Sequence, residues 1–249
     1  MRRLIIGDIH GQYNRMIDAL SRSHYNPYKD ELYPLGDLCD RGPNQIKVLD
    51  YIYSLPNCHP ILGNHDLYLM EYLSHTIPSY RLDNWLRQRN GGLITLKEVD
   101  KQSIEWQQNV LNRLLSTPFV RMLDSNIIVH GGISIELMNN HTPIDFINKT
   151  SSDISKKEYT DIYNELVWDR SLINDSIEKG YEPEAPWNYR FIVGHTPILN
   201  ENKIPYISPT IINIDTGSFV ENGCITVMDI DTLEYWQSTT PVEQPFEVI

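Results

Sequence analysis

Short apolar runs alternate with segments of helical periodicity along the first third of the chain. The run at residues 2–6 ends at a glycine, and apolar positions at helical spacing follow at 14–23. The same order recurs at 31–55 and again at 58–73. Three strand–loop–helix units within 75 residues predict an α/β fold whose polar loops lie at the carboxyl ends of parallel strands. Pro34 places the second of these strands at the edge of its sheet or ends it early.

The remaining pattern predicts a helical middle and a strand-rich end. Residues 78–124 are predicted to be mainly helical, and apolar runs that end in polar loops occur at 125–132 and 190–197. Three later runs predict consecutive strands in an antiparallel flank or a second sheet, at 211–215, 224–230 and 233–237.

Length and composition favour a single large domain. The 249 residues are 41% hydrophobic and 22% charged, and a chain of this length buries roughly 70–75% of the surface of its unfolded form. We therefore expect one domain over residues 1–249. Polar residues dominate 139–186, which is expected to be either a lid over the functional site or a solvent-facing excursion.

Net charge and cysteine content limit which classes of binding partner and which cellular compartment are expected. A net charge of -12 argues against a nucleic-acid polymer, because binding one needs a basic face that releases counterions. No apolar run approaches about 18 residues, so no membrane partner is expected. The three cysteines (Cys39, Cys58 and Cys224) lack the spacing of a disulfide framework or a zinc knuckle, which favours a reducing cytoplasm.

Residues capable of metal and acid–base chemistry collect where the predicted strands end. In an extended backbone Asp8 and His10, two positions apart, project to the same side, so both can reach one metal ion. Taken singly, such residues are also typical of a turn, a helix N-cap or a surface ion pair. Together they predict one site at a sheet edge. Five glycine-adjacent loops contain Asp8, His10, Asp37, Asp40, Arg41, Asn64, His65, Asp66, His130 and His195.

The order and spacing of these loops resemble a known family. The motifs are GDIHGQ (7–12), GDLCDRGP (36–43), GNHD (63–66), HGG (130–132) and GHT (194–196). They are similar to those of the calcineurin-like metallophosphoesterases, and more narrowly to the short bacterial and phage branch of the phosphoprotein phosphatases. NWLRQRNGG (84–92) and VWDRSLI (167–173) resemble further segments of that branch. The resemblance implies two mixed β-sheets sandwiched between helices, a four-layer αββα arrangement.

The resemblance also implies a pair of divalent metal ions. Asp8 and His10 would bind the first ion, Asp37 would bridge both, and Asn64, His130 and His195 would complete the second. Mixed oxygen and imidazole ligands suit Mn²⁺, Fe or Zn²⁺, and we expect Mn²⁺ first; the lack of thiolate ligands argues against a closed structural zinc site. Two such ions acidify a bridging water for in-line attack on phosphorus.

Four more residues receive roles from the resemblance. His65 matches the general acid that protonates the leaving oxygen, and Asp40 would orient its ring. Arg41 and Arg170 match the arginines that clamp phosphate, although the short WDR segment also fits a structural ion pair of Asp169. The segment at Asp215 and Thr216 is similar to the closing strand of the family and is expected to shape the site.

The motifs leave the substrate open between two classes of enzyme. Asp66 stands where protein phosphatases usually carry glutamate, and GNHDLYLM resembles the symmetrical diadenosine tetraphosphatases, which act on dinucleoside polyphosphates. Asp40, NWLRQRNGG and INIDTG favour a serine/threonine phosphatase acting on phosphorylated proteins or peptides, and this is our first expectation. A catalytically silent metal-binding interaction module is a third hypothesis. It predicts damage to the acid or the clamps, yet His65, Asp40 and Arg41 are intact.

Overall fold

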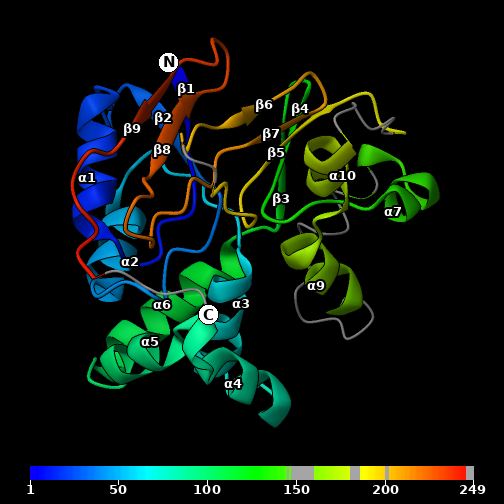
Figure 1. Cartoon of the computed structure of the whole chain (residues 1–249). Coiled ribbons are helices and arrows are strands. Elements are labelled where there is room, and N and C mark those ends of the chain that lie inside the picture. The colour runs from blue at the N-terminus through cyan, green and yellow to red at the C-terminus, as the bar shows by residue number, and fades with distance from the viewer. Residues whose placement is uncertain (145, 147–159, 180–185, 200–201, 245–249) are drawn as a thin grey trace.

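Two mixed β-sheets face each other at the centre of the computed structural model, which describes residues 1–144, 146, 160–179, 186–199 and 202–244 (Figure 1). The first sheet contains, in spatial order, β2 (Asp30–Pro34), β1 (Arg2–Ile6), β8 (Thr226–Asp229) and β9 (Tyr235–Gln237). The second contains β3 (Val120–Leu123), β4 (Asn126–Val129), β5 (Arg190–Val193), β7 (Ile211–Asn213) and β6 (Tyr206–Ile207). The pairs β1–β2, β4–β5 and β5–β7 are parallel and the others antiparallel. The predicted fold class of two mixed sheets is therefore confirmed.

Helices cover the outer faces of both sheets (Figure 1). On the side of the first sheet lie α1 (Tyr13–Arg22) and α2 (Gln45–Ser54), and on the side of the second lie α7 (Ile135–Asn140) and α10 (Ser171–Lys179). The remaining labelled helices lie below the sheets in this view: α3 (Asn64–Leu73), α4 (Ser79–Leu86), α5 (Gly92–Val99), α6 (Ile104–Ser116) and α9 (Thr160–Trp168). The short 3-10 helix η1 (Gln88–Asn90) lies between α4 and α5 in the chain. Among the described residues, none of the helices has both the length and the apolar character needed to cross a membrane.

Strand alternation explains how the sheets and helices pack. Ile5 of β1 packs between the sheets, and its neighbours Leu4 and Ile6 belong to the larger core on the helical side, because successive strand residues point to opposite faces. Each fully buried aliphatic side chain of this kind contributes about 1.5–3 kcal/mol relative to an exposed one. The layer between the sheets is completed by Tyr33, Leu35, Ile61, Ile128, Ile192, Ile212, Ile214, Met228 and Ile230.

The third strand expected from the sequence, near residue 58, is reduced to one bridge between Leu32 and Cys58. The segment does run beside β2, since Leu32 donates to the Asn57 carbonyl and His59 donates to the Leu32 carbonyl. The next bond of this parallel ladder requires an N–H from Pro34, which has none. Pro34 accordingly ends β2, and β2 is the edge strand of its sheet, as predicted.

Other expectations fare differently. Residues 78–124 are mainly helical, as predicted, and the strand β3 (Val120–Leu123) follows the last of these helices. The late strands are not one flank: β7 joins the second sheet, whereas β8 and β9 pair in the first. Helices α9 and α10 occupy part of the stretch 139–186, of which residues 145, 147–159 and 180–185 lie outside the described residues, so its role as a lid or as a solvent-facing excursion stays a prediction.

Asp30 ties the start of β2 to the first strand and generates a stability prediction. Its carboxylate accepts hydrogen bonds from Arg2 Nε (3.2 Å), Arg2 Nη2 (2.7 Å) and the Asn26 N–H (2.9 Å). Burial raises the pKa of Asp30, but the hydrogen bonds from Arg2 and Asn26 outweigh it and lower that pKa below the usual value. The contribution of the carboxylate to stability is therefore present above the unfolded pKa and is lost as pH falls through the folded one.

Asp30→Asn is expected to lower the free energy of unfolding by about 1–2 kcal/mol at neutral pH, because charged hydrogen bonds are lost. The gap between the two proteins should shrink as pH falls below about 4. Urea unfolding of both proteins over this range measures it, with Asp83→Asn, a change at an exposed position of α4, as the control. A gap that does not vary with pH would contradict the ionic origin.

Candidate metal and phosphate site

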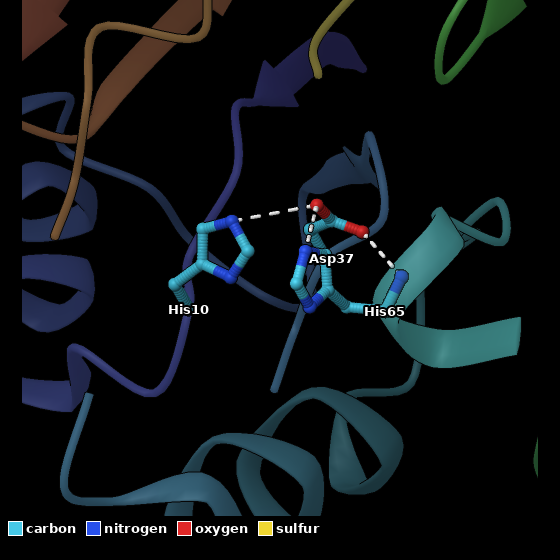
Figure 2. Close-up of side chains that lie close together, drawn as sticks. All are labelled: His10, Asp37 and His65. Atoms are coloured by element: carbon cyan, nitrogen blue, oxygen red, sulfur yellow. Dashed lines mark hydrogen bonds and ion pairs between the residues drawn. The ribbon is translucent and has the colours of Figure 1, made fainter. Parts of the chain in front are cut away.

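The loops that follow the strands bring two clusters of ligating side chains together around Asp37. The first cluster is His10, Asp37 and His65, and the second is Asp37, His130 and His195. Within each, the potential ligand atoms lie within 4.8 Å of one another, and every member is buried. Figure 2 shows the His10 ring and the His65 backbone directed at the Asp37 carboxylate. Asp37 is thus the residue that the two clusters share.

Both carboxylate oxygens of Asp37 contact histidines. Oδ2 lies 3.4 Å from His10 Nε2 and 3.9 Å from His65 Nε2, and Oδ1 lies 3.3 Å from His130 Nε2. The His65 N–H also donates to Oδ1 (3.0 Å). A Cβ on Gly63 would lie 2.2 Å from Oδ1, so glycine is required there for the carboxylate to fit.

The backbone of these loops is strained in a way that aims the side chains. A left-handed conformation is uncommon for residues other than glycine and costs free energy. Its concentration here indicates that surrounding structure enforces the geometry, as is common at functional sites. Five residues of the loops adopt positive φ: His10 (47°), Asp37 (51°), Asp40 (71°), Arg41 (66°) and His195 (62°).

Three of the histidines are held with the same ring nitrogen facing the centre. In each, Nδ1 donates to an oxygen acceptor, so Nε2 is the ring nitrogen that faces the centre, where it can bind a metal in His10 and His130 or carry a proton in His65. A ligating histidine is typically oriented in this way. The acceptors are the Cys39 carbonyl for His10 (2.9 Å), the Leu35 carbonyl for His130 (2.6 Å) and Asp40 Oδ2 for His65 (2.6 Å).

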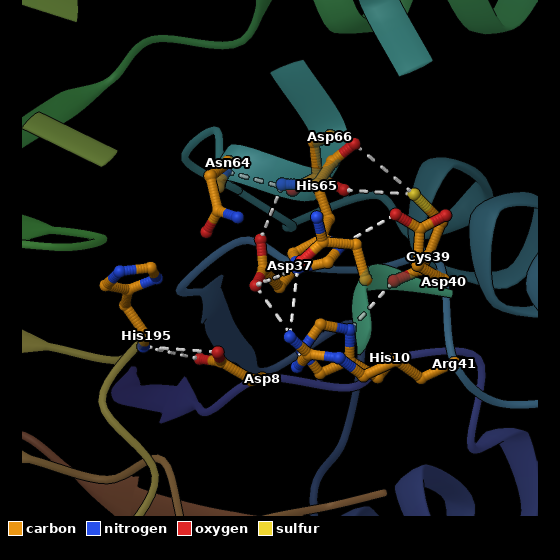
Figure 3. Close-up of polar contacts among 12 residues, drawn as sticks. Asp8, His10, Asp37, Cys39, Asp40, Arg41, Asn64, His65, Asp66 and His195 are labelled. Carbon is orange, nitrogen blue, oxygen red and sulfur yellow. Dashed lines mark hydrogen bonds and ion pairs between the residues drawn. The ribbon is translucent and has the colours of Figure 1, made fainter. Parts of the chain in front are cut away.

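The other expected ligands lie against the second cluster. Asn64 Oδ1 is 3.0 Å from His130 Nε2, and the Asp8 carboxylate accepts the His195 N–H (3.1 Å; Figure 3). Asp8 is a member of neither cluster as the described residues are arranged. His195 Nε2 and Asn64 Nδ2 are buried and have no hydrogen-bond partner among the described residues. A buried polar atom without a partner is costly, and Nε2 of His195 is suited to a metal ion.

The electrostatics also fit a cation. Burial and the Asp215 carboxylate raise the pKa of Asp8 well above its usual value, and burial with Asp37 raises that of Asp66 to about 7. Burial lowers the pKa of His130, but the neighbouring Asp37 carboxylate has the larger net effect and raises this pKa to about 10. The Asp8 carboxyl therefore favours its protonated form, and a divalent cation can replace that proton. Burial of Asp37, by contrast, is outweighed by the imidazoles that face it, which lower the pKa of Asp37 well below its usual value. The donor set fits two hard or borderline divalent ions.

Asp40 anchors a buried network behind His65. Besides His65 Nδ1, its Oδ2 accepts from Trp85 Nε1 (2.6 Å), and its Oδ1 accepts from the Thr95 hydroxyl. Asp40 is fully buried. Gly92 makes room for the indole, because a Cβ there would lie 2.4 Å from Trp85 Nε1. The contacts of Trp85 and Thr95 with Asp40 were not predicted, although Trp85 lies in the NWLRQRNGG segment.

The two predicted phosphate-binding arginines occupy different places. Arg41 Nη1 lies 2.6 Å from His10 Nε2, and its Nη2 lies 3.2 Å from His65 Nε2, so its guanidinium faces the first cluster. Arg170 is exposed and follows α9. The pKa of His195 is lowered first by burial, then by the charge of His130 and then by the charge of Arg170. Because Arg170 acts on His195 in this way, it lies near the second cluster.

The two residues expected to shape the site, Asp215 and Thr216, play different parts in the structure. The Asp215 carboxylate raises the pKa of Asp8, and burial raises the pKa of Asp215 itself to about 6. The Thr216 hydroxyl instead bonds to the Cys224 carbonyl (2.9 Å) and the Thr226 hydroxyl (2.7 Å), which fixes the loop.

Comparison with known proteins agrees with this arrangement. A curated symmetrical bis(5'-nucleosyl)-tetraphosphatase from Erwinia tasmaniensis is 36% identical over 137 residues, 54% of this chain and 45% of that protein. The chain spans less than half the length of the curated relatives it matches. The solved structure of a diadenosine tetraphosphatase-like protein has a TM-score of 0.60 at 17% identity and covers 96% of this chain and 93% of its own. A protein serine/threonine phosphatase from Saccharomyces cerevisiae has a TM-score of 0.59 at 14% identity, covering 98% and 82%.

These structures share the fold, and the family follows from a broader match. Residues 1–222 of the 249 match the family described as calcineurin-like phosphoesterase. The match includes every strand-end loop of the two clusters. The chain therefore belongs to the calcineurin-like phosphoesterase family.

Proposed function

We propose that the chain is a metal-dependent hydrolase that cleaves dinucleoside polyphosphates symmetrically, with diadenosine tetraphosphate as the substrate to test first. The observation that carries the choice of substrate is the 36–37% identity to relatives named symmetrical bis(5'-nucleosyl)-tetraphosphatases. GNHDLYLM in this chain supports the same choice. This substrate takes precedence over the phosphoprotein that the sequence first favoured.

The ligand assignment of this proposal combines the strand-end motifs with the two clusters that share Asp37. Members of the family use a dinuclear metal centre. Asp8 and His10 would hold the first ion, Asp37 both, and the second would be held by Asn64, His130 and His195. When bound, two divalent ions, Mn²⁺ first among those to test, supply a water of lowered pKa and polarise the phosphoryl oxygens.

The other side chains bind the phosphate and move a proton. Arg41 and Arg170 would hold phosphoryl oxygens, and Arg41 would exchange its contacts with the two imidazoles for contacts with the substrate. His65 would donate a proton from Nε2 to the leaving oxygen, with its ring held by Asp40 at Nδ1. Burial of both side chains keeps this pair away from bulk water.

A second candidate, hydrolysis of phosphoserine and phosphothreonine, is favoured by the Asp40–His65 pair. An alkoxide leaving group is strongly basic and requires a proton, whereas a nucleoside diphosphate leaves readily without one. A buried carboxylate at 2.6 Å that orients an imidazole is the arrangement that protonation of an alkoxide needs. The two candidates share the metal site and differ in the bond that is cleaved.

Substrate comparison tests the choice between them. With Mn²⁺, kcat/KM for diadenosine tetraphosphate is expected to exceed that for phosphothreonine peptides by at least about tenfold, since differences of about 1–3 kcal/mol are typical of discrimination between substrates. ADP should be the only nucleotide product. A preference for the peptide would reverse the order of the candidates, and no turnover of either would contradict both.

Removal of the shared carboxylate tests the metal assignment. Asp37→Asn is expected to lower kcat by at least roughly 100-fold, because changing even a residue that only hydrogen-bonds to a metal ligand typically lowers metal affinity or activity about 10–100-fold. Calorimetric titration with Mn²⁺ should show weaker binding at both sites. Asp83→Asn, the exposed control on α4, should leave binding and turnover unchanged. Full Mn²⁺ binding by Asp37→Asn would contradict the bridging role.

Leaving-group dependence tests the proposed acid. His65→Asn is expected to lower kcat roughly 10²–10⁴-fold on a substrate with an alkoxide leaving group and much less on an activated aryl phosphate. Asp40→Asn should act in the same direction with a smaller loss, since it removes only the orientation of the ring. Equal losses on both substrates would assign His65 to metal binding instead.

A further inference from the structure

A fully buried arginine on α1, outside all the motifs, contacts the loop that follows β7. Arg15 is 2% exposed, and its Nη1 donates to the carbonyls of Ser218 (2.7 Å) and Val220 (3.1 Å). Its Nη2 donates to the carbonyl of Glu221 (3.1 Å), and its Nε donates to the carbonyl of Thr240 (3.1 Å). Within the described residues no carboxylate forms an ion pair with it. These four hydrogen bonds offset the cost of burying the charge and hold the loop against α1.

The residue between the two carbonyls bound by Nη1 is Phe219. Its side chain is buried, and the Arg41 guanidinium lies over its ring with Cζ 4.2 Å from the ring centroid. The same ring meets His10 edge-on at 5.0 Å. Phe219 is thus in contact with both a proposed phosphate-binding arginine and a proposed metal ligand.

Arg41 depends on this ring for its orientation. Its backbone is left-handed, its Nε has no hydrogen-bond partner among the described residues, and no carboxylate within them holds its guanidinium. The contacts of its Nη atoms are with His10 and His65, and phosphate binding would replace them. The face of Phe219 is the contact that can persist in both states, because a cation above a ring leaves the edge N–H groups free.

We propose that Arg15 and Phe219 are positioning residues for the phosphate-binding arginine. Arg15 fixes the loop 218–221 from α1, and the loop presses Phe219 against the guanidinium of Arg41. The route runs from α1, which lies beside β8 and β9 (Figure 1), to the centre of the site. This inference rests on the proposed role of Arg41 in binding phosphate.

Steady-state kinetics on p-nitrophenyl phosphate with Mn²⁺, and inhibition by inorganic phosphate, test the proposal. Phe219→Leu is expected to raise KM and the inhibition constant of phosphate about tenfold, while kcat changes less than about threefold. Phe219→Tyr keeps an aromatic face and should restore most of the affinity. Arg15→Met should shift the same two constants, and Arg22→Met, at an exposed position of the same helix, should shift neither.

A double-mutant cycle separates positioning from a purely structural role. If Arg15 and Phe219 act through Arg41, their effects on the phosphate constants should vanish in an Arg41→Ala background. Additive effects would overturn the proposal, as would unchanged phosphate constants in Phe219→Leu when Arg41→Ala shifts them. Should Arg15→Met fail to fold, the Phe219 variants with Arg41→Ala complete the cycle. A wild-type protein without turnover would instead contradict the proposed function.

Discussion

The interaction on which the site depends is the sharing of the Asp37 carboxylate among imidazoles from separate loops. Histidines that follow β1 and β4 and one at the start of α3 place Nε2 within 3.3–3.9 Å of its oxygens. The sheets make this possible because the strands preceding Asp37, His10 and His130 deliver their loops to one edge. The left-handed backbone at Asp37 and the space beside Gly63 complete the fit. Loss of that carboxylate would leave buried imidazoles facing one another without a counter-charge.

The sequence predicts the parts of the molecule that local pattern controls. Short apolar runs that end in polar loops predict most strands, and the glycine-adjacent loops predict which side chains meet at the edge. Where the prediction fails, the cause is a pairing between distant segments. The strand expected near residue 58 lacks a ladder because Pro34, 24 residues earlier, has no N–H to donate. Strand β3 depends on pairing with β4, which periodicity in 78–124 does not reveal.

The residues missed in the site share one property: their role is a contact that has no signature in sequence. Trp85 and Thr95 reach Asp40 across 45 and 55 positions, and both are apolar or small residues in helices. Arg15 is a charged residue within an amphipathic helix, a pattern typical of a solvent-facing side chain. It is instead buried against a loop about 200 residues further along the chain. Burial of charge is decided by the tertiary structure, so these roles become visible only in three dimensions.

The two substrate candidates converge on one physical difference, the basicity of the leaving oxygen. In both proposed reactions, divalent ions at the ligand clusters would act on phosphorus in the same way, whether the cleaved bond leads to another phosphate or to a carbon atom. A proton donor matters most when the leaving oxygen is an alkoxide, and the Asp40–His65 pair is buried and oriented for that task. Identity to dinucleoside tetraphosphatases points the other way. The proposed site therefore combines sequence identity to enzymes named for cleaving a phosphoanhydride with a histidine–carboxylate pair whose geometry suits an alkoxide leaving group.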